Sequence, residues 1–133
     1  MSNLYRIEKL EQELQNLTNR IETIQDTVIV SIDGFVVAAH TPEDLTGQKA
    51  NSPQIAAMTA ALAGLGEKTL MQMAQGNLSR LLIEGEHGAL IVYPININAA
   101  IAAIVDKNAK MGLILHEIAR TSNVINSILN SSL

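Results

Sequence analysis

Two segments of this chain, 27–32 and 98–105, are apolar on both of their alternating sets of positions. Successive side chains of a β-strand point to opposite faces of a sheet, so both faces of these strands are apolar. Apolar sheet faces must be covered, and helices are the usual cover on both sides of a sheet. The sequence therefore predicts a three-layer α/β (α+β) sandwich, with helices above and below one sheet.

Short turn sequences indicate how the strands connect. Asp33-Gly34 separates two apolar runs, and Asp-Gly at such a place is typical of a type I′ hairpin turn. Gly-Glu-His-Gly at 85–88 suits a second hairpin loop. Hairpin-linked neighbours make the sheet largely antiparallel. The five predicted strands cover residues 27–32, 35–40, 78–84, 89–93 and 98–105.

Three helices are expected around these strands, in the order αββαβββα. A middle helix should begin with Ser52 as N-cap and Pro53 at its first position, run to about residue 75 and stop at Gly76. The first helix is predicted from Leu4, Ile7, Leu10, Leu14, Leu17, Ile21 and Ile24. The spacing of these apolar residues favours a helix that lies on a sheet, and a coiled coil is the alternative. The last helix is predicted after Asp106 and carries on one side Met111, Ile114, Leu115, Ile118, Ser122, Ile125 and Leu129.

Length and composition exclude several classes of protein. A chain of 133 residues is the size of one domain, so we expect a single domain over 1–133. The absence of cysteine excludes disulfides and thiolate metal sites. A net charge of −4 argues against binding to nucleic acid or an anionic membrane surface. No apolar run approaches the ~20 residues of a membrane-spanning helix, so we expect a cytoplasmic protein without membrane insertion.

The middle helix is unusual because residues 54–66 include no charged side chain. A helix with one buried face would normally carry charges on the other. At 100° per residue, one band contains Ile55, Met58, Leu62, Leu65, Thr69 and Met73, and we assign this band to the sheet. The opposite side carries Ala57, Ala60, Ala61, Gly64, Lys68 and Met71.

This small-residue side has two interpretations. It could be an exposed alanine face that favours helix formation. Gly64 and Gly66 argue against that, since each costs roughly 1 kcal/mol of helix propensity relative to alanine. Small residues let two helix backbones approach closely, which favours contact with a second copy of the chain about a two-fold axis.

We find no set of residues that predicts catalysis, a cofactor or a metal. Gly64-Leu65-Gly66 lies inside a helix, so it does not match a phosphate-binding loop between strand and helix. His40, His87 and His116 are expected at a strand end, in a turn and on a polar helix side, and their spacing does not suit a metal. The chain is therefore expected not to be an enzyme.

The charges of segment 78–84 leave two alternatives open. Arg80 and Glu84 are predicted to share one face of a strand, with Leu82 between them. Charges on an outer strand can simply discourage uncontrolled pairing. They can also select the register of one specific partner strand.

The element order and the hairpin Val28-Ile29-Val30-Ser31-Ile32-Asp33-Gly34-Phe35-Val36-Val37-Ala38-Ala39 resemble the Roadblock/dynein light-chain family, above all its prokaryotic gliding-motility protein B type. The segment from Ile55-Ala56-Ala57-Met58 to Leu65-Gly66 and the hairpin 81–92 are similar to later elements of that family. The resemblance covers about residues 10–129. It implies a profilin-like sandwich, with the middle helix on one face of a five-stranded antiparallel sheet and the terminal helices on the other.

The resemblance also implies a homodimer, formed through 52–75 and 78–84 so that two sheets become continuous. Carried onto this chain, the dimer interface comprises Ala57, Ala60, Ala61, Gly64, Lys68, Met71, Leu78, Arg80, Leu82 and Glu84. A heterodimer with a related chain is the alternative.

Members of this family are non-enzymatic platforms, and many bind Ras-like GTPases. The resemblance therefore implies that this chain binds such a GTPase and modulates its GTP hydrolysis. An arginine supplied in trans can accelerate GTP hydrolysis. Arg80 and Arg120 are the candidates, but neither lies on an extended glycine-rich loop, so we expect no arginine finger. Two alternatives are a structural adaptor that does not affect hydrolysis and, less favoured, a small-ligand sensor.

Overall fold

The computed structural model describes residues 3–42 and 52–131, and it confirms the predicted element order. The elements are α1 (Asn3–Arg20), β1 (Ile24–Ser31), β2 (Val36–His40), α2 (Ser52–Gln72), β3 (Leu81–Glu84), β4 (Gly88–Asn96), β5 (Ala99–Asp106) and α3 (Met111–Asn130). The polar loop that Thr41 to Asn51 predict between the second strand and the middle helix falls mostly on residues 43–51, which lie outside the described residues.

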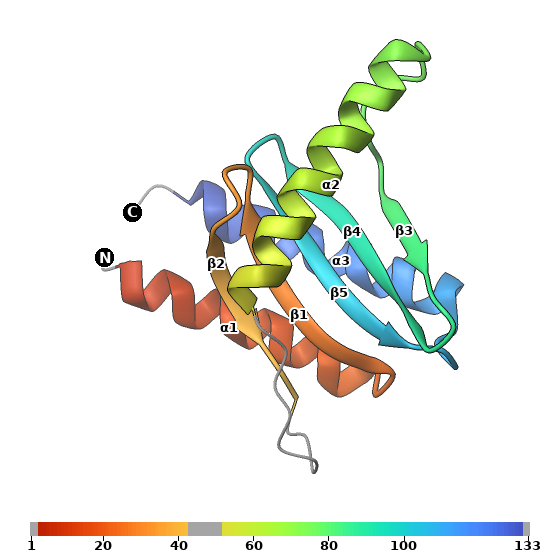
Figure 1. Cartoon of the computed structure of the whole chain (residues 1–133). Coiled ribbons are helices and arrows are strands. Elements are labelled where there is room, and N and C mark those ends of the chain that lie inside the picture. Colours follow the sequence, from red (N-terminus) through yellow and green to blue (C-terminus); the bar gives the residue numbers. More distant parts are fainter. Residues whose placement is uncertain (1–2, 43–51, 132–133) are drawn as a thin grey trace.

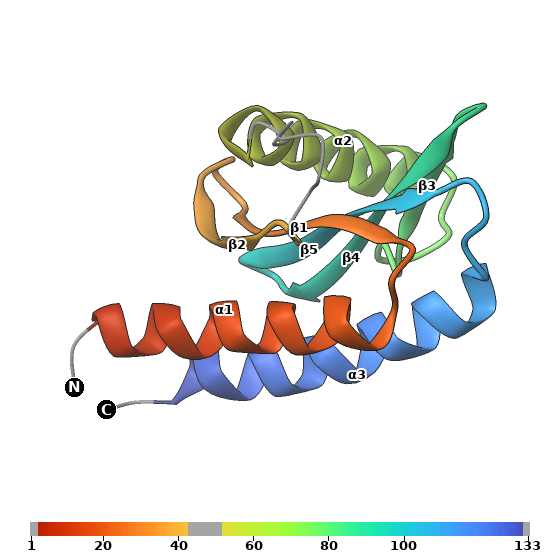
Figure 2. The same cartoon turned by 90° about the horizontal axis from the view of Figure 1, so that it is seen from below.

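The five strands form one antiparallel sheet in the order β2-β1-β5-β4-β3 (Figure 1). The central pair β1 and β5 is the pair predicted to be apolar on both faces. Seen from below, α2 covers one face of the sheet, and α1 and α3 lie side by side on the other (Figure 2). The predicted three-layer α/β sandwich, with one helix on one face and two on the other, is therefore confirmed.

The two faces of the sheet differ in the size of their side chains. On the α1 and α3 side, Ile29, Ile91 and Ile101 are completely buried together with leucines and isoleucines of both helices. On the α2 side the buried cluster contains only Val28, Val30, Ala56 and Ala102. The larger core therefore lies between the sheet and the two terminal helices.

The first helix packs on the sheet and on α3, as expected for the interpretation without a coiled coil. Its stripe is buried from Leu10 onwards, whereas Leu4 is exposed. The prediction that the helix includes Ile21 and Ile24 is wrong, because the helix ends at Arg20 and Ile24 begins β1. Both isoleucines are still buried. The apolar spacing of α1 continues past its last residue into β1, so the spacing did not mark the end of the helix.

An ion-pair network joins α1 to α3 through the buried Glu117 and two exposed arginines. Glu117 accepts hydrogen bonds from Arg20 Nε at 2.8 Å and from Arg120 Nη1 at 3.2 Å. Arg20 also donates to the hydroxyl of Thr121 at 3.2 Å. Burial alone would raise the pKa of Glu117, but the two arginines outweigh it and hold the pKa below its ordinary value. The carboxylate therefore stays charged and fixes the two helices against each other.

The β1–β2 turn differs from the predicted type I′ turn. A type I′ turn needs positive φ at both central residues, but only Gly34 has one, at 87°. Ser31 N–H donates to Phe35 O at 2.9 Å, and Gly34 N–H donates to Ser31 O at 2.9 Å. The loop thus has three residues, with Gly34 supplying the left-handed conformation of a bulge turn. One more residue, Ile32, is therefore in the turn than the sequence predicted.

Strand limits also differ from the predictions, most clearly for the third strand. It was expected over 78–84 but comprises only Leu81–Glu84. The backbone N–H of Leu78 donates to Glu67 of α2 at 3.0 Å instead of to a neighbouring strand. β4 extends beyond the predicted 89–93 to Asn96, with a register irregularity after Pro94. The other strands agree with their predicted limits to within a few residues.

The second helix ends before Gly76, where it was expected to stop. Gln75 N–H donates to Leu70 O at 2.9 Å, and Ala74 N–H donates to Met71 O at 3.2 Å. These are the two hydrogen bonds of a Schellman motif, which needs a left-handed residue at its centre. That residue is Ala74, with φ of 56°. A Cβ makes this conformation unfavourable, so the helix stop is provided by an alanine at some cost in stability.

We therefore expect Ala74→Gly to stabilise the protein by about 1 kcal/mol, because glycine adopts positive φ without the Cβ clash. Urea unfolding followed by circular dichroism measures the change. The matched control is Ala61→Gly in the middle of the same helix, which should destabilise by about 1 kcal/mol. Equal destabilisation by both substitutions would contradict the assignment of Ala74 as the helix stop.

Candidate interface along the middle helix

The side of α2 that faces the sheet is made of small residues. Ala56 and Thr59 are its buried side chains, while Met58 and Leu65 are 56% and 63% exposed. The prediction that the band with Met58, Leu65 and Met73 lies on the sheet is therefore wrong. The sheet beneath α2 is lined by small residues such as Ala102, and large helix side chains there would hold the helix away from it.

The two flanks of α2 have different neighbours. On one flank, Ala57 and Ala60 lie against the β1–β2 turn, where a Cβ added at Gly34 would be 3.5–3.6 Å from them. On the opposite flank, a Cβ added at Gly66 would be 3.5 Å from the side chain of Leu78, which leads into β3. This second flank therefore faces the β3 side of the sheet (Figure 1).

Large apolar side chains are concentrated toward the β3 side of α2. At 100° per residue, Met58, Leu62 and Leu65 fall between the outward direction and the Gly66 flank. Met58 and Leu65 are mostly exposed and Leu62 is half-buried. We call these three residues the α2 apolar flank. Exposed apolar residues that form a contiguous surface mark sites of interaction.

Next to this flank lies an open strand edge. β3 pairs with β4 on one side, from Leu81↔Val92 to Glu84↔Ala89, and is the outermost strand of the sheet. Its other side has no strand partner within the described part of the chain. Ile83 is 43% exposed and Glu84 is exposed. Unpaired N–H and C=O groups on such an edge can accept another strand.

The predicted interface residues fall into four groups. Ala61 and Lys68 point outward from α2, Arg80 and Glu84 are exposed near the β3 edge, and Leu82 is half-buried. Ala57, Ala60, Gly64 and Met71 lie toward the flank away from β3. Leu78 is buried against α2, so its side chain packs inside the protomer. Arg80 precedes β3 rather than belonging to it.

Sequence reasoning missed the exposure of Met58 and Leu65 because it gave the larger side chains to the sheet. The signal that could have found them is the alanine content of 99–103, because a helix can approach such a strand closely only with small side chains of its own. It also missed Thr59, whose buried hydroxyl has no hydrogen-bond partner among the described residues.

Across residues 3–42 and 52–131, no three His, Asp or Glu side chains gather as metal ligands. His87 and His116 are exposed, and His40 is half-buried at the end of β2. The helices within these ranges are too short or too polar to cross a bilayer. Arg120 is held by Glu117 on α3, which lies on the opposite face of the sheet from α2.

One antiparallel sheet between one helix and a pair of helices defines a class of small three-layer α/β domains. Residues 10–105 match the model of the Roadblock/LC7 domain, and the chain belongs to this family. An uncharacterized protein of Methanocaldococcus jannaschii is 26% identical over 110 residues, which is 83% of this chain and 91% of that protein.

Solved structures share the fold at lower identity. A Roadblock/LC7 domain from Streptomyces avermitilis superposes with a TM-score of 0.81 at 19% identity, covering 91% of this chain and 98% of that one. MglB from Myxococcus xanthus superposes with a TM-score of 0.83 at 15% identity, covering 92% of this chain and 89% of that one. The gliding protein MglB from Thermus thermophilus superposes with a TM-score of 0.82 at 18% identity, covering 92% of this chain and 90% of that one.

Proposed function

We propose that this chain is a non-enzymatic homodimeric platform that binds a small Ras-like GTPase and modulates its GTP hydrolysis. The observation that carries the proposal is the α2 apolar flank beside the open edge of β3. The family resemblance supports the GTPase as partner. One MglB structure with the same fold, at a TM-score of 0.83 and 17% identity, has a tetrameric arrangement.

The proposed dimer pairs β3 with its copy about a two-fold axis, so that the two sheets become one. The same axis brings the two α2 apolar flanks together on one face of the joined sheet. This arrangement buries Met58 and Leu65, which are the most exposed large side chains of the flank. It also removes the open strand edges, which otherwise favour uncontrolled association.

The charges at the strand edge fit one register of this pairing. In an antiparallel pair centred on Leu82, Arg80 stands directly opposite Glu84 of the partner subunit. The two-fold axis repeats this pair, so the interface gains two opposite-charge contacts. A shift of register would separate these charges or place like charges together. The edge therefore specifies its own copy as a partner.

Leu65→Glu should dissociate the dimer, because burying an unpaired carboxylate in the apolar flank is unfavourable. Light scattering coupled to gel filtration should give twice 14.3 kDa for the unmodified protein and 14.3 kDa for the variant. The matched control is Leu113→Glu, since Leu113 is a leucine of α3 with similar exposure, 53%. This control should remain dimeric. A monomeric unmodified protein at micromolar concentration would refute the dimer.

Charge exchange tests the register. Arg80→Glu alone should raise the dimer dissociation constant about tenfold, since two attractive pairs become repulsive and each is worth up to ~1 kcal/mol. Glu84→Arg alone should have the same effect. The double variant Arg80→Glu, Glu84→Arg should recover most of the affinity in analytical ultracentrifugation. Additive loss in the double variant would contradict the proposed pairing.

The mode of regulation follows from the positions of the arginines. Arg120 is engaged by Glu117, and Arg80 belongs to the proposed strand pairing. Both arginines are engaged in these contacts, so we expect the platform to act by ordering the GTPase's own switch segments. The acceleration should therefore be smaller than the ~10³-fold that an arginine in trans supplies.

Phosphate release by the host's Ras-like GTPases, with and without this protein, is the direct measurement. We expect tighter binding to the GTP-analogue state and faster release with the unmodified dimer, and a smaller effect with Leu65→Glu. Leu113→Glu should behave like the unmodified protein. Equal binding in both nucleotide states with unchanged hydrolysis would favour the adaptor alternative. No binding in either state would refute the GTPase proposal.

A further inference from the structure

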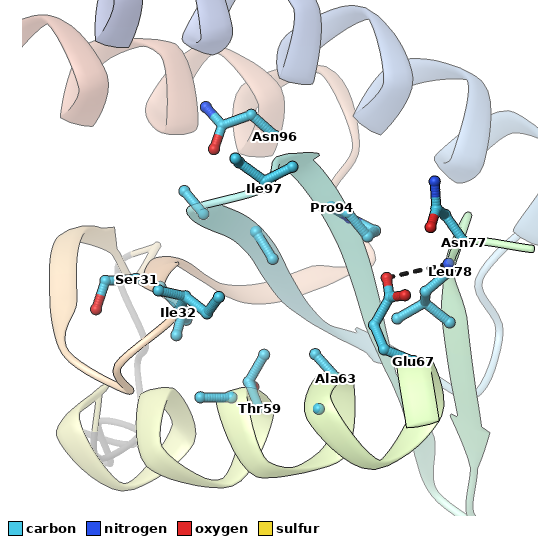
Figure 3. Close-up of a pocket in the computed structure, with 15 residues that line it drawn as sticks. Ser31, Ile32, Thr59, Ala63, Glu67, Asn77, Leu78, Pro94, Asn96 and Ile97 are labelled. Atoms are coloured by element: carbon cyan, nitrogen blue, oxygen red, sulfur yellow. Dashed lines mark hydrogen bonds between the residues drawn. The ribbon is translucent and has the colours of Figure 1, made fainter. Parts of the chain in front are cut away.

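A cavity of about 500 Å³ lies between α2 and one end of the sheet (Figure 3). Its walls are mainly short side chains, among them Ala60 and Ala63 of α2 and Ala100 of β5. Its volume falls within the range of small-molecule sites in proteins. Ile32 and Ile97, which come from two neighbouring hairpin turns, also line it and are 64% and 86% exposed.

The cavity lies beside the end of β4 that β3 does not cover. Pro94 of β4 lies beyond Val92, the last residue of that strand to pair with β3. The segment before β3 instead turns to α2, where Leu78 N–H is bonded to Glu67. Small residues on both the helix and the sheet then leave the space unfilled. The space opens to solvent beside the exposed Ile32 and Ile97, so a small molecule can enter it.

Thr59 places an unused hydroxyl at this cavity. The residue is 1% exposed, and its Oγ1 has no hydrogen-bond partner within the described residues. Figure 3 shows its side chain directed from α2 toward the sheet side of the cavity. Threonines in helices can satisfy the hydroxyl on the carbonyl four residues earlier, as Thr69 does with Leu65 O at 2.7 Å. Thr59 makes no such bond, so its hydroxyl is a buried group without a partner in the described part of the chain, at the wall of the cavity, and a rotation about the Thr59 χ1 angle would present it to an occupant.

The other polar lining groups restrict the charge of that occupant. Glu67 is the one ionisable side chain among the lining residues, and one of its oxygens already accepts the N–H of Leu78. A carboxylate at the wall disfavours an anionic ligand. Asn96 already donates to Asn126 and accepts the N–H of Asn98. Ser31 Oγ accepts the N–H of Phe35, and Asn77 is exposed. Thr59 is therefore the buried polar side chain of the lining that has no partner among the residues described.

We infer that this cavity binds a small uncharged amphiphile, with an apolar body among the alanines and one hydroxyl or carbonyl group hydrogen-bonded to Thr59. This inference does not depend on the dimer or on the GTPase. The site lies on the opposite side of α2 from the α2 apolar flank. Ligand binding and subunit association can therefore be tested separately.

Octanol and octanoate are suitable probes because they differ in the charge of the head group. Isothermal titration of the full chain should show saturable one-to-one binding of octanol and much weaker binding of octanoate. Thr59→Val keeps the shape of the side chain but removes the hydroxyl, and should weaken octanol binding about tenfold. The same variant should raise the melting temperature of the unliganded protein, because it removes a buried unsatisfied group. Thr69→Val is the matched control and should not change octanol affinity.

Ala63→Met provides a second variant, since a larger side chain at the wall should reduce octanol binding by filling the space. Three results would overturn the inference. These are the absence of saturable octanol binding to the unmodified protein, octanoate binding as tight as octanol, and equal octanol affinity in Thr59→Val and Thr69→Val. Loss of binding in Thr59→Val together with a raised melting temperature would support it, because a merely structural threonine would not produce both effects.

Discussion

The unequal faces of the central sheet govern the rest of this structure. Toward α1 and α3 the sheet presents isoleucines such as Ile29 and Ile101, and two long helices are needed to bury them. Toward α2 it presents smaller residues such as Ala102, which form a shallow layer. A single helix can approach this layer only with small side chains beneath it. Ala56 and Thr59 fulfil that condition, so the larger side chains of α2 point away from the sheet.

Two features that bear on function follow from this arrangement. The orientation of α2 about its own axis exposes Met58 and Leu65 next to the open edge of β3. This surface is the basis of the proposed dimer. The small residues beneath the helix also leave the cavity beside Thr59. Interface and cavity thus lie on different sides of one helix and have a common physical origin.

The sequence predicted the element order, the antiparallel sheet and the three layers, because apolar periodicity and turn residues are local signals. It was less successful where two local signals competed. Ile24 continued the helical spacing of α1 but begins a strand, since a buried position suits either element. Gly76 looked like the end of α2, but Ala74 adopts the left-handed conformation and ends it earlier. At 33–34 the turn contains one more residue than the Asp-Gly pair suggested.

The amino-acid sequence by itself determined that a sheet with two apolar faces lies between helices, and that the middle helix has no charged face of its own. Only the tertiary structure decided which side of that helix meets the sheet. The reason is that helix orientation depends on the sizes of side chains on two surfaces that are distant in sequence. The candidate interface, the open edge of β3 and the unpaired hydroxyl of Thr59 all depend on that orientation.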